Sequence, residues 1–308
     1  MAAFTTTLST TASLDDSIKL AYDQSFLIAT GMSDVMDQLA QYRQSIGAKS
    51  ITLTKYPRLA VATTPLTETD DLTSAQMTDS AIVVTPLEYG NVVTTTALAD
   101  LQSGGQAGRA AVEIVGLNAA ETSNALATLA LDAGTKVTIN DTALASIINT
   151  EICTGAFLNR MYNKLSRVNT IKFANGLYAA VLHDDVITDL RASAAAGDWV
   201  DVTKYSDPAS ALMNEIGTYR GFRIITNNAA TINADAGAGA VDVYNSYFLG
   251  QNALGLAESL PSQLVMTGPY DKLGRFINVG WKRVAAYKII DTDALVVGQT
   301  ASSVGANV

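Results

Sequence analysis

The chain has 308 residues, one cysteine, one histidine and a net charge of −9 at pH 7. Charged residues make up 16% of the chain, against about 25% in ordinary soluble proteins. A single cysteine excludes an internal disulfide framework, and one cysteine with one histidine leaves almost no material for a zinc site or a Cys–His nucleophile pair. The acidic balance argues against a dedicated nucleic-acid binder, whereas a polar but weakly ionised surface favours contact with other proteins.

The N-terminal region predicts an arm without a core of its own. Residues 1–13 lack the basic start and apolar centre of a secretory signal, and no apolar run in the chain reaches the roughly 18 residues of a membrane span. Residues 1–14 hold no charge and little apolar mass, so we expect them to be extended or disordered in isolation. Two short helical patterns follow, beginning at Asp15 and ending before Gly47.

From residue 50 to residue 96 the apolar period changes to that of a strand. The first limb holds Pro57 and Pro65, and an acidic, turn-like tip follows at residues 68–71. The second limb carries apolar residues from Ile82 to Tyr89. This pattern predicts a long two-limbed β excursion, with its prolines at edge positions. Because an isolated ribbon is marginally stable in water, we expect it to pair with another surface.

Two helices are predicted in the middle of the chain. Residues 106–134 contain no proline and repeat apolar residues at helical spacing, which predicts the longest helix of the protein. A second helical pattern runs from Thr142 to Arg167 and ends with three basic side chains, as the helix dipole favours. Beyond residue 170 we expect a mixed α/β region. Its predicted elements are strands at Leu177–Leu182, Gly221–Thr226 and Val243–Leu249, helices starting at Asp184 and covering Ala209–Ile216, a loose insert at 227–240, and a long strand or hairpin at Arg275–Ile290.

The sequence offers few residues for catalysis. His183, Asp184 and Asp185 could act as a base with an orienting carboxylate, which gives a hydrolase as one hypothesis. The alternative interpretation is a strand-to-helix turn in which the aspartates cap the helix. A glycine-rich stretch at 104–108 lacks the Lys-Ser/Thr of a phosphate loop, and Cys153 is interpreted as a small buried hydrophobe. We therefore predict no catalytic, cofactor-binding or metal-binding residue.

The order of elements resembles the HK97-like major capsid proteins of tailed bacteriophages. Six stretches carry the resemblance, which spans roughly residues 15–298: TPLTETDDLTS, VVTPLEYGNVVTTTALAD, LNAAETSNALATLAL, NGLYAAVLHDDVITDLRA, EIGTYRGFRIITNN and GRFINVGWKRVAAYKIID. The resemblance implies an α+β fold of the HK97-like capsid type. Its implied parts are an N-terminal arm (1–48), an E-loop formed as an extended β ribbon (49–95), a peripheral domain with a spine helix (96–149), an α/β axial domain (150–265) and C-terminal strands that return to the peripheral domain (266–308).

The resemblance also implies a function. The chain would be a structural protein rather than an enzyme, without a cofactor, that self-assembles as hexamers and pentamers into an icosahedral shell around phage double-stranded DNA. Its implied place is the virion, after assembly in the host cytoplasm. The implied partners are other copies of itself, a portal protein at one vertex, a separate scaffolding protein, a decoration protein, and DNA by weak non-specific contact, with no membrane. An encapsulin-like nanocompartment shell is the alternative that keeps the fold.

Contacts between subunits are expected at charged residues. Because nothing nearby in the sequence offsets the acidic tip, we expect it to meet a basic patch on a neighbouring subunit. The tip residues are Glu68, Asp70 and Asp71, and the candidate patch residues are Arg58, Arg160, Lys164 and Arg167. Some family members crosslink through an E-loop lysine. Here Lys49 and Lys55 lie near the base of the loop and its tip has no lysine, so we expect no such crosslink.

Overall fold

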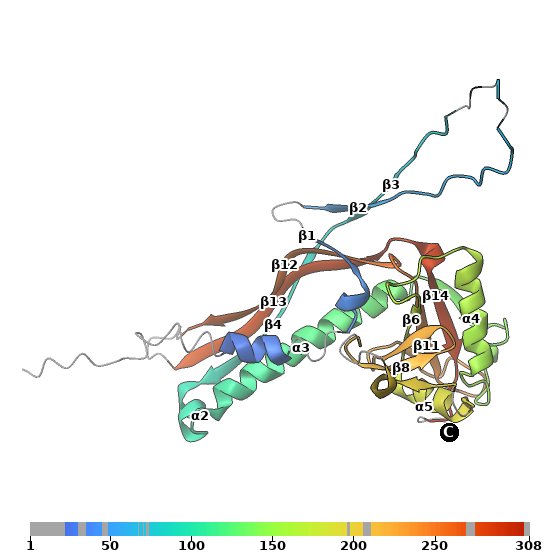
Figure 1. Ribbon diagram of the computed structural model, residues 1–308. Coiled ribbons are helices and arrows are strands. Elements are labelled where there is room, and N and C mark those ends of the chain that lie inside the picture. Colours follow the sequence, from blue (N-terminus) through green and yellow to red (C-terminus); the bar gives the residue numbers. More distant parts are fainter. Residues whose placement is uncertain are drawn as a thin grey trace, which may run out of the picture.

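The computed structural model combines an elongated lobe, a compact α/β lobe and a loop that projects from the body (Figure 1). It describes residues 22–29, 35–44, 49–66, 68–69, 71, 74–195, 198–205, 211–268 and 275–304. Within those ranges, no helix is both long enough and apolar enough to cross a membrane.

The elongated lobe is a four-stranded sheet with a long helix on one face. The strand order is β1-β12-β13-β4, with β1 parallel to β12 and the other pairs antiparallel. The strands are β1 (Gln41–Gln44), β4 (Leu87–Thr96), β12 (Leu254–Thr267) and β13 (Phe276–Ile289). After β4 the chain forms helix α2 (Ala97–Gln102), with Thr96 as its N-cap, and continues into helix α3 (Gln106–Leu131).

Helix α3 confirms the prediction of a long helix. At 1.5 Å per residue its 26 residues span about 39 Å, so it runs along the elongated lobe and into the compact one (Figure 1). Val112, Val115 and Ala119 are buried against Val279 and Trp281 of β13. Alternate residues of a strand share one face, so the neighbouring residues of β13 lie on the opposite face.

The compact lobe is built on an eight-stranded sheet with the order β5-β14-β11-β6-β9-β8-β7, and with β10 paired to β11. Helices α4 and α5 pack on one face, and the end of α3 packs on the other. The strands are β5 (Thr135–Thr138), β6 (Tyr178–Leu182), β7 (Val200–Asp201), β8 (Glu215–Tyr219), β9 (Phe222–Thr226), β10 (Ile232–Asn233), β11 (Val243–Leu249) and β14 (Leu295–Thr300). The helices are α4 (Gly155–Arg167) and α5 (Asp184–Ser193), with short 3-10 turns η1 (Asp37–Leu39), η2 (Leu144–Ser146), η3 (Val202–Lys204) and η5 (Thr292–Ala294).

The projecting loop is anchored by a short ladder. Strand β2 (Ile51–Lys55) pairs with β3 (Ser80–Val84) over five residue pairs. Between residues 56 and 79, no described residue belongs to a strand. Of the two-limbed β excursion predicted from residue 50 to residue 96, only Ile51–Lys55 and Ser80–Val84 pair with each other. Prolines at 57 and 65 cannot donate to a ladder, and β4 pairs with β13 within the elongated lobe.

Several other sequence predictions need correction. The helix predicted from Thr142 begins only at Gly155, after η2 and a loop. No described residue of the predicted helix Ala209–Ile216 is helical, because β8 begins at Glu215, whose buried carboxylate pairs with Arg223. The second helical pattern of the arm gives instead η1 followed by β1.

The two C-terminal strands belong to different lobes. Strand β13 lies in the elongated lobe, and β14 lies between β5 and β11 of the compact lobe. All six residues of β14 are buried, as a central strand requires. The insert at 227–240, predicted to be loose, is ordered in part by a backbone bond from Ala238 to Ile147.

Candidate functional site

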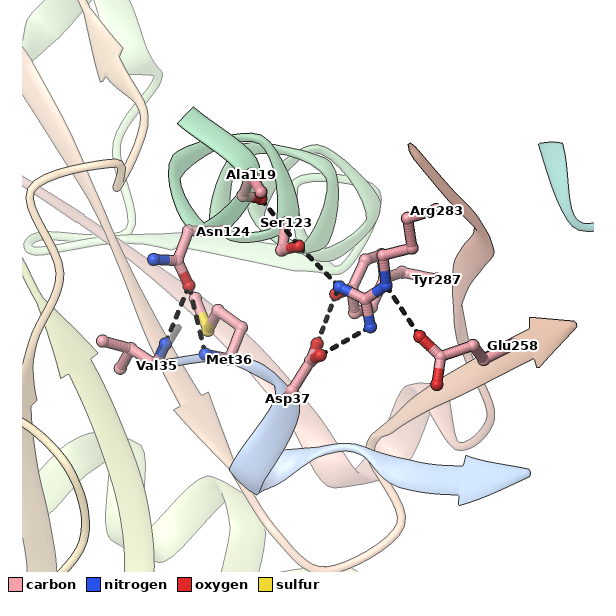
Figure 2. Close-up of polar contacts among 9 residues, drawn as sticks. All are labelled: Val35, Met36, Asp37, Ala119, Ser123, Asn124, Glu258, Arg283 and Tyr287. Carbon is pink, nitrogen blue, oxygen red and sulfur yellow. Dashed lines mark hydrogen bonds and ion pairs between the residues drawn. The ribbon is translucent and has the colours of Figure 1, made fainter. Parts of the chain in front are cut away.

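A polar cluster holds part of the arm against the joint between the lobes (Figure 2). We call residues 35–44 the strap. At its start, the backbone N–H groups of Val35 and Met36 both donate to Oδ1 of Asn124, at 3.1 and 3.2 Å. Asn124 lies on α3 and is 5% exposed, so the side chain of the helix replaces water for two backbone donors.

Arg283 of β13 is the centre of the cluster. Its guanidinium donates to Glu258 on β12 at 2.8 Å, to Asp37 of the strap at 2.6 Å and to Oγ of Ser123 on α3 at 2.5 Å. Tyr287 also accepts from Arg283 at 3.2 Å and donates to Asp37. One side chain thus connects the strap, the long helix and two strands of the sheet.

The cluster is buried, which sets its energetics. The side chains of Arg283 and Glu258 are 6% and 7% exposed. Burial alone would lower the pKa of Arg283, but Tyr287, Asp37 and Glu258 together raise it. Removing one partner of such a pair leaves a buried charge without compensation, which typically costs about 3–5 kcal/mol.

The strap also fills the joint with apolar side chains. Val35, Met36 and Leu39 are buried in one core with Leu131 of α3 and Tyr247 of the compact sheet. On the outer side, Gln38 and Met213 exchange two hydrogen bonds, of 3.0 and 2.9 Å. The strap therefore contacts both lobes through polar and apolar groups.

Sequence reasoning missed this cluster. Its members come from four elements, and Asp37 lies 246 residues from Arg283. One signal was present in the sequence. In the strand predicted at Arg275–Ile290, Arg283 lies two residues after Trp281 and four after Val279, so an unbroken strand puts it on their apolar face, where a charge needs a partner.

The histidine cluster serves as a helix cap. Nδ1 of His183 accepts from the backbone N–H of Asp185 at 3.2 Å, so His183 is the N-cap of α5. The carboxylate of Asp184 accepts from Thr226, and that of Asp185 accepts from Tyr244 at 3.0 Å. The ring lone pair and both carboxylates thus have structural partners. The strand-to-helix turn is present as predicted, but its cap is His183, whereas Asp184 and Asp185 lie in the first turn of α5. The arrangement gives no support to the hydrolase hypothesis.

The predicted acidic tip lies on the projecting loop. Glu68 and Asp71 are exposed, and Asp70 lies outside the described residues. The loop also exposes large apolar side chains, which include Leu59, Val61, Leu66 and Met77, each at least 66% exposed.

The predicted basic residues divide into two groups. Arg58 donates to the backbone carbonyl of Asn169, and Arg160 pairs with Asp141 and donates to the carbonyl of Ile139 at 2.6 Å. Lys164 and Arg167 are exposed on the outer side of α4. With Arg160 they line a shallow hollow of about 480 Å³.

The two lysines near the base of the loop are not equivalent. Lys49 is exposed. Nζ of Lys55 is 2.6 Å from Oδ1 of Asp291, so this lysine holds the base of the loop to the segment before β14. Within the described residues, no group of three histidine, cysteine, aspartate or glutamate side chains could hold a metal ion.

Solved structures share this fold. The capsid of Ralstonia phage GP4 aligns with a TM-score of 0.74 at 14% identity, over 87% of this chain and 88% of that one. The Cyanophage Pam1 capsid aligns with a TM-score of 0.64 at 12% identity, over 88% and 92%. The head structure of Helicobacter pylori bacteriophage KHP40 aligns with a TM-score of 0.61 at 9% identity, over 88% and 91%. No protein-family model and no curated protein matches the chain. The chain therefore has the HK97-like capsid fold that its sequence resembles.

Proposed function

We propose that this protein is the major capsid protein of a tailed bacteriophage. Copies of it would assemble as hexamers and pentamers into an icosahedral shell around double-stranded DNA. The fold supports this role, because the solved structures named above are phage capsids and heads. The same comparison favours a virion over an encapsulin-like compartment.

The projecting loop is the observation that carries the proposal. Its ladder contributes only five residue pairs. Near its base Arg58 bonds the carbonyl of Asn169, and the described part of the loop beyond this contact projects away from the body (Figure 1). Leu59, Val61 and Leu66 are each more than 60% exposed. A segment that extends apolar side chains into water gains stability only when another surface covers them. A second copy of the chain supplies that surface in a closed lattice.

The parts of the structure take roles in this proposal. The described part of residues 22–44 is the arm, the projecting loop is the E-loop, the elongated lobe is the peripheral domain and the compact lobe is the axial domain. We further propose a portal protein at one vertex and a separate scaffolding protein. Contact with packaged DNA would be weak and salt-screened, given the net charge of −9.

We also propose a specific contact between copies. The acidic tip (Glu68, Asp70 and Asp71) would meet the basic surface of α4 on a neighbour. Arg58 and Arg160 already bond within their own subunit, so Lys164 and Arg167 would supply most of the attraction. These two side chains are exposed beside the hollow on α4.

The experiment compares assembly of the purified full-length chain with that of one loop variant. The variant replaces Leu59, Val61 and Leu66 by serine. We expect closed shells from the unchanged chain in sedimentation and electron microscopy, and unassembled subunits or capsomers from the variant. Equal circular dichroism and thermal melting of the two unassembled chains would show that the body folds in both. A monomeric unchanged chain whose residues 56–79 resist proteases would overturn the proposal.

A further inference from the structure

We propose that residues 35–44 act as a latched strap that fixes the angle between the two lobes of the subunit. The latch is the contact of Asp37 with Arg283, supported by Asn124. The strap bridges both lobes, which distinguishes it from a segment that packs on one surface. Its consequence for shell curvature rests on the proposed function, whereas the latch itself does not.

The connection between the lobes consists of few covalent crossings. Helix α3 runs from one lobe into the other, and the chain crosses again between β11 and β12 and between β13 and β14. The strap adds a further connection, because β1 extends the elongated sheet in parallel to β12 while Gln38 bonds Met213 next to the compact sheet. A rotation of one lobe against the other would have to break one of these two attachments.

The latch has the properties of a discrete contact. Asp37 of the strap bonds the guanidinium of Arg283, and its side chain is 27% exposed, whereas that of Arg283 is 6% exposed. Arg283 has a second carboxylate partner, Glu258, at 2.8 Å. Loss of the arm contact therefore leaves the arginine paired, so the strap can detach while the sheet stays folded.

The strap also excludes water from the joint. Met36 is fully buried and Val35 is 1% exposed, in the same core as the end of α3 and the inner face of the compact sheet. Packed cores have discrete arrangements rather than continuous ones. We infer that the latched strap selects a single angle between the lobes and that detachment allows others.

In a shell, that angle would set the curvature of each capsomer. Hexamers and pentamers place identical chains at slightly different inclinations, and a joint held by one strap restricts the range that each chain reaches. Shells built from subunits without a latch should therefore vary more in diameter.

The test uses three variants of the full-length chain. Asp37→Asn removes the charge of the latch, Gln38→Ala removes the bonds to Met213 on the exposed side, and Asp23→Asn is a matched control because Asp23 is an exposed carboxylate of the same arm. Hydrogen–deuterium exchange of unassembled protein measures the strap, with β11 as the internal reference. Electron microscopy of assembled preparations measures shell diameter.

We expect Asp37→Asn to raise exchange in residues 35–44 by about tenfold or more, with β11 unchanged and Asp23→Asn equal to the original chain. Gln38→Ala should raise exchange in residues 35–44 by a smaller factor. If Asp37→Asn does not fold, the exchange of the Gln38→Ala variant tests the strap instead. Unchanged strap exchange in the folded variants would overturn the latch. Faster exchange with a single unchanged shell diameter would overturn the role in curvature. A chain that forms no shells would contradict the proposed function, while the exchange result would still decide the latch.

Discussion

At the scale of single residues, Gly116 shows how closely the arm fits on α3. A Cβ at this position would lie 2.8 Å from Cβ of Ala29 and 3.2 Å from the carbonyl oxygen of Phe26. Both belong to the helix of residues 22–29, in which Phe26 is 1% exposed. The glycine therefore allows the two helices to approach each other.

This fit predicts the sign of a substitution. Gly116→Ala gains about 0.5–1 kcal/mol of helix propensity, but inserting a methyl group into a packed contact typically costs about 1–3 kcal/mol. We expect a net loss of docking of residues 22–29, measured as faster proteolysis of the arm. Gly108→Ala is the matched control, because its Cβ would meet nothing closer than 3.5 Å and should stabilise the helix. Equal arm protection in both variants would contradict the prediction.

Cys153 gives a second prediction at the same scale. Burial, followed by the charge of Asp189, raises the pKa of its thiol from 9.0 to about 12. Above pH 9 the unfolded chain loses this proton while the folded chain keeps it, so the folded state binds more protons. The free energy of unfolding should therefore fall as pH rises, by at most about 1.4 kcal/mol per pH unit from this group.

Chemical denaturation of the original chain and of Cys153→Ala measures that slope. The alanine variant lacks the thiol, so its stability should fall less steeply between about pH 9 and 10. Loss of packing in the alanine variant lowers its free energy of unfolding by the same amount at both pH values. The difference in slope between the two chains is therefore unaffected. Parallel slopes would show that the thiol ionises as easily in the folded state as in the unfolded one.

At the scale of elements, the spacing of apolar residues correctly predicted the helices and strands that are determined by local sequence. Helix α3 and strands β6, β9, β11 and β13 were predicted close to their observed bounds, because an uninterrupted apolar period decides them. The helix predicted from Thr142 failed in its first half. Ile147 is buried in a small cluster with Val243 of β11. This tertiary contact outweighs the helical spacing of apolar residues in that part of the sequence.

The strap could not be predicted for a similar reason. Its pattern of Met36, Leu39 and Tyr42 fits a helix, but the described residues 35–44 form a 3-10 turn followed by β1. The backbone donors that a longer helix would use internally go to Asn124, 88 and 89 residues away. A sequence pattern contains no information on a partner at that distance. The Arg283 cluster was missed on the same grounds.

At the scale of the whole molecule, the projecting loop carries acidic side chains and α4 carries basic ones, and we propose that the two meet between subunits. Glu68 and Asp71 are exposed on the projecting loop, and Lys164 and Arg167 are exposed on α4. Among the described residues, none of these four side chains forms a salt bridge within its own chain. In the proposed shell, the acidic side chains of one copy would contact the basic side chains of its neighbour. Such contacts between exposed charges at the edge of an interface weaken as the salt concentration rises.

Charge reversal tests this contact. Glu68→Lys with Asp71→Lys should lower shell yield by roughly tenfold at low ionic strength, and the deficit should shrink near 1 M salt, where the Debye length is about 3 Å. Adding Lys164→Glu and Arg167→Glu to the same chain should restore yield, because the reversed charges attract again. Glu113→Lys, at an exposed position of α3, controls for net charge. Yield and melting that stay unchanged across salt, or a quadruple variant that assembles no better than the double one, would exclude the contact.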